Sequence, residues 1–157
     1  MTSAPEFNSD SPDETRVLGE RLGTLLQPGD VLLLSGELGA GKTTFVQGLA
    51  RGLGFQGSVS SKSFVLLGEY AGRTKLYHAD LYRLEDPQEV QELALDELSV
   101  DGVLVVEWPE RGEWVLPPEH LRILFRGISE ERRALRFEAC GPRAAEIVQR
   151  LAVLVSS

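Results

Sequence analysis

The sequence feature that most constrains the fold is the octapeptide GELGAGKT at residues 36–43, which directly follows the apolar run VLLLS at residues 31–35. The octapeptide satisfies the pattern G-x-x-x-x-G-K-[S/T], which forms a phosphate-binding loop where a strand leads into a helix. Residues 31–35 predict a buried strand, and Thr43–Leu53, closed by Gly54, predict a helix. This order of strand, loop and helix therefore favours an α/β protein that binds a nucleotide.

Each part of the octapeptide has a physical role in that interpretation. The glycines let the backbone wrap closely around phosphate oxygens, and successive N–H groups and the start of the helix attract the negative charge. Lys42 can reach the β- and γ-phosphates, and the Thr43 hydroxyl can bind Mg²⁺. A chance glycine-rich turn is the alternative, and the strand before it and the helix after it disfavour that reading. The predicted nucleotide-binding residues are Gly36, Glu37, Leu38, Gly39, Ala40, Gly41, Lys42, Thr43 and Thr44.

A P-loop also needs a carboxylate for the magnesium ion, usually at the end of a neighbouring apolar strand. The run Val103–Val106 predicts a strand in the middle of a sheet, and Glu107 ends it. We therefore expect Glu107 to be a metal ligand together with Thr43, although a strand-end glutamate that faces solvent is the alternative. Trp108 follows directly and would either stack on a ligand or fill the core.

Two further clusters are candidates for function. If Thr74–Tyr82 form a strand, alternation places His78, Asp80 and Tyr82 on one face, where titratable groups could orient a water molecule or ligands of the metal. The alternative is a surface ion pair between Asp80 and Arg83. The segment SKSF at residues 61–64 lies where P-loop proteins often carry a loop that senses the γ-phosphate, or it is simply a polar loop.

The remaining chain predicts a single α/β domain over residues 11–157, a P-loop NTPase-like three-layer fold with a mixed parallel and antiparallel sheet. We expect residues 1–10 to be disordered. Ser11-Pro12-Asp13-Glu14 is typical of a helix start, and that helix should run to about Leu26. The other expected elements are strands at 64–70, 121–126 and 134–138 and helices at 86–95 and 142–153.

The charge balance limits the partners. With 24 acidic and 16 basic residues the formal net charge is −8, which argues against autonomous binding to a nucleic acid backbone. No apolar run is long enough to predict a membrane span, and no secretory signal is expected. The single cysteine, Cys140, excludes an internal disulfide, so we expect a cytoplasmic protein.

With these motifs together, residues 14–112 resemble the TsaE family of small bacterial P-loop ATPases. The resemblance rests on the P-loop and its helix, on HADLYR at residues 78–83, and on EWPE at residues 107–110. It implies an ATPase that acts with TsaD and TsaB in the threonylcarbamoyl modification of adenosine 37 in tRNA. The protein would contact tRNA only indirectly, through that complex. Mg²⁺ and ATP are the implied cofactor and substrate.

The resemblance also implies roles for individual residues. Lys42 would hold the phosphates as a catalytic residue, and Asp80 would be a catalytic carboxylate that acts on the attacking water or the metal. Thr15 would lie near the adenine, and Arg132 or Arg133 would approach the nucleotide. The family usually has Ser-Pro-Thr where this chain has Ser61-Lys62-Ser63, so the loop is expected to be less rigid.

Two other functions are compatible with a P-loop. A small-molecule kinase usually carries an arginine-rich lid over the phosphates, and no such segment is apparent after Glu107. A nucleotide-gated binding module, in which hydrolysis is incidental, would suit the acidic surface. Phosphate release with and without TsaD and TsaB distinguishes these functions.

Overall fold

The computed structural model describes residues 5–37, 41–57, 67–82, 86–92 and 94–156. The strands are β1 (Glu6–Ser9), β2 (Val31–Ser35), β3 (Leu67–Ala71), β4 (Lys75–Asp80), β5 (Gly102–Glu107), β6 (His120–Gly127) and β7 (Arg133–Cys140). The helices are α1 (Pro12–Leu25), α2 (Lys42–Gly52), α3 (Pro87–Glu92), α4 (Leu95–Leu98) and α5 (Pro142–Ser156), with 3₁₀ turns at Pro109–Arg111 and Glu113–Val115.

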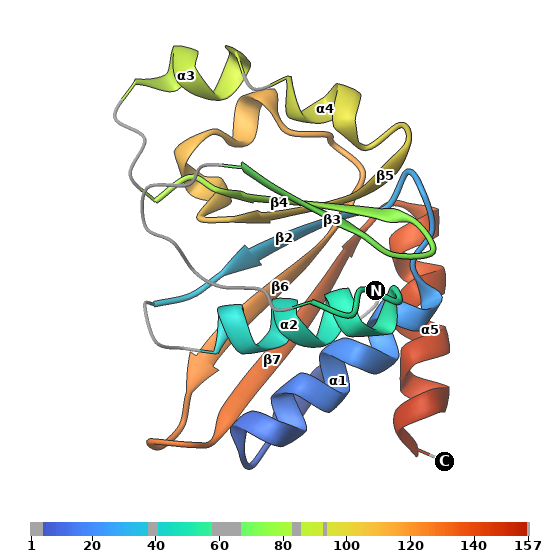
Figure 1. The fold of residues 1–157 in the computed structure, drawn as a ribbon. Coiled ribbons are helices and arrows are strands. Elements are labelled where there is room, and N and C mark those ends of the chain that lie inside the picture. Colours follow the sequence, from blue (N-terminus) through green and yellow to red (C-terminus); the bar gives the residue numbers. More distant parts are fainter. Residues whose placement is uncertain (1–4, 38–40, 58–66, 83–85, 93, 157) are drawn as a thin grey trace.

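The seven strands form one mixed sheet in the order β1-β7-β6-β2-β5-β4-β3 (Figure 1). The central strand β2 is parallel to both β5 and β6, and β4 is parallel to β5. The outer pairs, β1 with β7, β6 with β7 and β3 with β4, are antiparallel. The carboxyl ends of β2, β4 and β5 therefore meet at one edge, where ligands bind in open α/β sheets.

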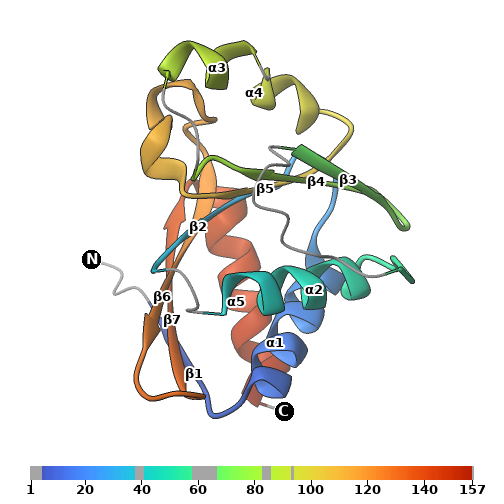
Figure 2. The ribbon, with the colours of Figure 1, turned by 60° about the vertical axis from the view of Figure 1, so that its left-hand side comes forward.

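Helices cover both faces of the sheet, as Figures 1 and 2 show. Alternate residues of β2 point to opposite faces: Leu32 and Leu34 pack in the core under α1, α2 and α5, and Val31 and Leu33 pack in a second core with Leu95 of α4. The result confirms the expected three-layer α/β fold. None of the helices in the described part of the chain is long and apolar enough to cross a membrane.

Four glycines bring α1 and α2 into close backbone contact. A Cβ added at Gly19 or Gly23 of α1 would lie 2.4 Å from the Phe45 carbonyl oxygen or 2.5 Å from the Leu49 carbonyl oxygen. On α2, a Cβ at Gly48 would lie 2.1 Å from the carbonyl oxygen of Arg16, and one at Gly52 would lie 2.2 Å from that of Glu20. Only glycine permits this approach. The contact fixes the start of α1 beside the start of α2.

The start of α1 follows the sequence prediction closely. Ser11 caps the helix by accepting a hydrogen bond from the Glu14 amide at 3.2 Å, and Pro12 occupies the first turn. The Glu14 carboxylate reaches back to accept from the Asp10 amide at 3.0 Å. The first bond satisfies a backbone donor that a helix start otherwise leaves free, and the second ties the residue before the cap to the first turn of α1.

The structure corrects two expectations about the elements. Residues 6–9, expected to be disordered, form β1, because they pair with β7 and Phe7 packs edge-on against Phe137, with the ring centroids 5.0 Å apart. Residues 1–4 lie outside the described part. The single helix expected at 86–95 is instead α3 and α4, and Ala94, with φ of 49°, stands at the start of α4. A left-handed residue cannot continue a regular helix.

Candidate nucleotide-binding site

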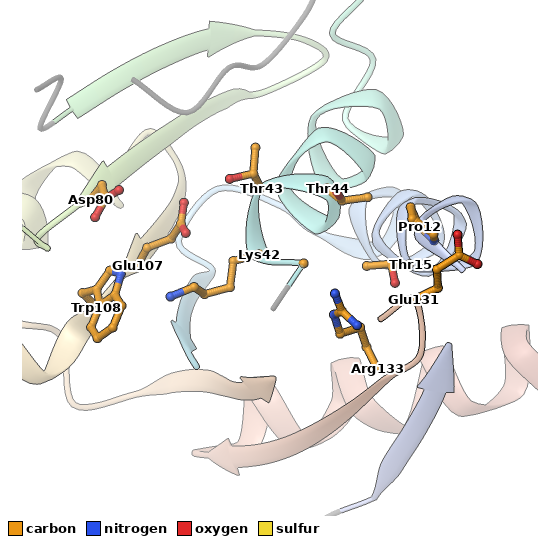
Figure 3. Close-up of a pocket in the computed structure, with 11 residues that line it drawn as sticks. Pro12, Thr15, Lys42, Thr43, Thr44, Asp80, Glu107, Trp108, Glu131 and Arg133 are labelled. Carbon is orange, nitrogen blue, oxygen red and sulfur yellow. The ribbon is translucent and has the colours of Figure 1, made fainter. Parts of the chain in front are cut away.

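A pocket of about 230 Å³ lies at the carboxyl ends of the parallel strands, beside the start of α2 (Figure 3). One end carries Asp80, Glu107 and Trp108, the middle carries Lys42 and Thr43, and the other end reaches α1 and β7. The lining residues are Pro12, Thr15, Gly41, Lys42, Thr43, Thr44, Asp80, Glu107, Trp108, Glu131 and Arg133. The pocket is therefore elongated, with Asp80 and Glu107 at one end and Glu131 and Arg133 at the other.

Two glycines of the octapeptide have backbone conformations that suit glycine. Gly36 has φ of +141°, and a Cβ there would lie 2.8 Å from the Phe125 carbonyl oxygen. Gly41 has φ of +98° and immediately precedes α2. The left-handed backbone at Gly41 turns the chain into the helix, so that the first amides of α2 line the pocket. Leu38, Gly39 and Ala40 lie outside the described residues, and Glu37 is exposed.

Lys42 is buried at the first position of α2, with only 4% of its surface exposed. Its Nζ donates to the Gly36 carbonyl oxygen at 2.6 Å and lies 4.1 Å from the centroid of the Trp108 ring. Burial lowers the pKa of Lys42, and nearby carboxylates, chiefly that of Glu107, oppose the shift. The ammonium group is thus held inside the pocket by a carbonyl, an aromatic face and negative charge.

Asp80 and Glu107 are paired in register across β4 and β5, so both carboxylates reach the pocket from neighbouring strand ends. Burial raises the pKa of Asp80, and the charge of Glu107 raises it further. A hydrogen bond from the Tyr82 amide to Asp80 Oδ1, at 3.0 Å, opposes the rise. The alternative of a solvent-facing Glu107 is wrong, since its exposed fraction is 4%.

His78 lies on the same face of β4 as Asp80, as alternation predicts. Its Nε2 lies 2.5 Å from Glu107 Oε2, and both side chains are buried. Tyr82 follows the strand, and its ring lies 4.8 Å from that of Trp108. Trp108 has φ of 58°, a strained value for a bulky residue. Arg83, the other partner of the alternative ion pair, lies outside the described residues.

The opposite end of the pocket lies between α1, α2 and β7. The Thr15 hydroxyl is 2.6 Å from the buried Ser9 hydroxyl, which ties β1 to α1. Arg133, the first residue of β7, lines the pocket, whereas Arg132 is exposed and its Nε lies 3.5 Å from Asp10 Oδ1. The structure therefore brings Arg133, and not Arg132, to the pocket. Arg132 precedes β7 in the turn between β6 and β7, where its guanidinium lies beside Asp10 instead.

The sequence did not predict two of the residues that line the pocket, and the structure does not test one predicted segment. Pro12 and Glu131 line the pocket, but the sequence marked Pro12 only as a helix start and gave no signal for Glu131. Residues 61–63, the candidate γ-phosphate sensor, lie outside the described residues. Thr44 lines the pocket from the first turn of α2, beside Thr43.

The oxygen atoms at the carboxylate end suit a magnesium ion. The Thr43 hydroxyl and the carboxylates of Asp80 and Glu107 line one pocket, and Mg²⁺ prefers such hard oxygen ligands. Within the described residues, no group of three or more His, Cys, Asp or Glu could hold a metal ion by itself. This pattern fits a cation that binds through one or two protein oxygens and completes its coordination with phosphate and water.

Comparison with known proteins assigns this architecture to a family. The family model for "Threonylcarbamoyl adenosine biosynthesis protein TsaE" matches residues 9–135. A TsaE protein from Bacillus subtilis is 41% identical over 143 residues, covering 90% of this chain and 89% of its own length. One from Treponema pallidum is 41% identical over 128 residues, covering 81% of this chain and 95% of its own length.

A solved structure extends the comparison to the fold. The crystal structure of YdiB from Bacillus subtilis superposes with a TM-score of 0.79 and 34% identity, covering 97% of this chain and 96% of that one. The similarity therefore includes the C-terminal third, which the sequence motifs matched only by its strand pattern.

Proposed function

The chain belongs to the TsaE family, and from that membership and the pocket geometry we propose that it is a Mg²⁺-dependent ATPase. It supports the threonylcarbamoyl modification of tRNA, together with TsaD and TsaB. Its relatives are named as tRNA threonylcarbamoyladenosine biosynthesis proteins. The single observation that carries the proposal is one pocket that joins the start of α2 to Asp80 and Glu107.

The ends of the pocket suggest how ATP lies in it. Lys42 and the first amides of α2 bind the β- and γ-phosphates, since they supply the positive charge in the middle of the pocket. The base then extends toward Thr15 and Arg133, where the guanidinium plane can stack on a purine. This orientation puts the terminal phosphate at the end that Asp80 and Glu107 occupy.

The metal would be held by Thr43 and Glu107, and when bound it neutralises negative charge on the phosphates. Asp80 has a separate role. Because its pKa is raised, its carboxylate accepts a proton more readily than an ordinary aspartate and can orient the attacking water. Lys42 exchanges the Gly36 carbonyl for phosphate oxygens, which are stronger acceptors.

Measurement of phosphate release tests this function. The lone protein is assayed with ATP and Mg²⁺, and then again with purified TsaD and TsaB. We expect slow release by the lone protein, stimulation by the two partners, and loss of both when Asp80 is replaced by Asn. Transfer of phosphate to a small acceptor would indicate a kinase instead. Nucleotide binding with no release under either condition would indicate a nucleotide-gated binding module.

A further inference from the structure

The contact between His78 and Glu107 links the pocket to a residue that does not line it. The register pairs Asp80 with Glu107 and His78 with Val105. His78 therefore lies two residues closer to the start of its strand than the residue directly beside Glu107. Alternation puts both side chains on the α2 face of the sheet, and the imidazole reaches the carboxylate diagonally across the two strands. His78 is absent from the residues that line the pocket, whereas Glu107 is among them.

The hydrogen bond has a defined direction. The 2.5 Å contact joins His78 Nε2 to Glu107 Oε2, and the two side chains are 8% and 6% exposed. An ionised carboxylate only accepts hydrogen bonds, so Nε2 carries the proton and donates it. Buried charge without a hydrogen-bond donor is costly, and the bond therefore restrains the carboxylate to one orientation. The second oxygen, Oε1, can bind a cation without breaking the bond.

We propose that His78 is a positioning residue that holds the Glu107 carboxylate for Mg²⁺ when a nucleotide is bound. The inference rests on the proposed function, because it takes Glu107 as a metal ligand. His78 acts through Glu107 alone and touches neither the nucleotide nor the metal. Partners that orient a metal ligand in this way typically contribute about 10- to 100-fold to metal affinity.

The test measures how much Mg²⁺ tightens the binding of a nonhydrolysable ATP analogue. Calorimetric titrations with Mg²⁺ and with EDTA give two dissociation constants, and their ratio isolates the contribution of the metal. His78→Leu removes the donor. His78→Gln retains an N–H donor at a similar distance from the backbone. The side chain in His78→Asn also carries an N–H donor but is too short to reach Glu107. His120→Leu is the matched control, since the chain has two histidines and His120 bonds to the Pro117 carbonyl oxygen.

We expect His78→Leu and His78→Asn to lose about 10- to 100-fold of the Mg²⁺-dependent tightening. Their affinity in EDTA should stay within about threefold of wild type, because Lys42 and the α2 amides are unchanged. His78→Gln and His120→Leu should keep the wild-type ratio. A merely structural role for His78 would weaken binding equally in Mg²⁺ and EDTA.

Two results would overturn the inference, and they are distinguishable. An unchanged ratio of the two dissociation constants in His78→Leu, whether or not both affinities fall, removes His78 as a positioning residue. It leaves the proposed function intact. Wild-type protein that binds the analogue no more tightly in Mg²⁺ than in EDTA removes the proposed metal dependence, and the role of His78 with it.

Discussion

At the scale of single residues, the roles that we propose for two pocket side chains conflict with stability. Lys42 is buried with a lowered pKa, and Asp80 has a raised one, so the folded protein disfavours the charged form of each. A bound triphosphate and metal would compensate these charges. Residues that are unfavourable in the empty protein and compensated by a ligand are typical of functional sites.

This conflict predicts that Asp80→Asn stabilises the nucleotide-free protein while it abolishes hydrolysis. Because the folded-state pKa of Asp80 is raised, its ionisation costs stability as the pH rises from the unfolded-state pKa through the folded-state pKa. Asparagine lacks that charge and keeps an acceptor for the Tyr82 amide. The melting temperature at neutral pH should therefore be higher for the variant.

The pH dependence provides an internal control for the Asp80 prediction. Acidification protonates Asp80 in the wild type, so the difference in melting temperature between the two proteins should shrink toward acidic pH. A variant that is less stable than wild type at neutral pH, or a difference that grows on acidification, would contradict the assigned pKa shift.

At the scale of elements, the contact between α1 and α2 determines where the α1 end of the pocket lies relative to its middle, which the start of α2 forms. Thr15 and Pro12 come from the start of α1, and the amides that we propose bind phosphate come from the start of α2. The four interhelical glycines set the distance between these helix starts. They therefore fix the position of Pro12 and Thr15 relative to the first residues of α2.

Gly48→Ala should destabilise the protein by about 1–3 kcal/mol, the usual cost of overpacking. Alanine favours a helix by about 1 kcal/mol over glycine, but its Cβ would lie 2.1 Å from the Arg16 carbonyl oxygen. Urea unfolding measures the difference. Gly127→Ala is the control, because a Cβ there meets nothing within 4 Å, and it should change the free energy of unfolding by less than about 0.5 kcal/mol. Equal effects of the two substitutions would refute the close helix contact.

The elements also show what a sequence can and cannot predict. The strand β2, the helix α2 and the strand β5 with Glu107 were predictable because each has a strong local signal of apolar periodicity or turn chemistry. The strand β1 was not, since four mainly polar residues gain their order only from pairing with β7, which is far along the chain.

Within the site, local sequence patterns predicted several of the residues that line the pocket, but they did not predict the contacts between those residues. The glycine-rich motif predicted Lys42 and Thr43, and the apolar run before Glu107 predicted a carboxylate at the end of a neighbouring strand. Asp80 was a candidate from strand alternation and from the family resemblance, and all four residues line the pocket. The contact of Lys42 with Trp108 depends on a left-handed backbone at Trp108, and no local pattern predicts that conformation. Choosing Arg133 over Arg132 required the exact start of β7, and strand boundaries are the least certain part of a sequence reading.

At the scale of the whole molecule, the net charge of −8 opposes direct contact with nucleic acid. We therefore predict that the protein alone does not bind tRNA at about 0.15 M salt, and that tRNA is reached only through TsaD and TsaB. Fluorescence anisotropy of a labelled tRNA over a salt series is the measurement. Micromolar binding with a steep salt dependence would contradict the prediction and indicate a basic surface that the overall charge conceals.

The central claim is that Lys42 and the start of α2 bind the phosphates of ATP. Calorimetric titration of a nonhydrolysable ATP analogue into the wild type, Lys42→Ala and Lys75→Ala tests it most directly. Lys75 is the control because it is exposed and bonds to Glu69 on the β3–β4 hairpin. We predict saturable binding to the wild type and Lys75→Ala, and a loss of about 1.5–3 kcal/mol of binding free energy in Lys42→Ala. Absence of binding to the wild type, or an unchanged affinity in Lys42→Ala, would contradict the account.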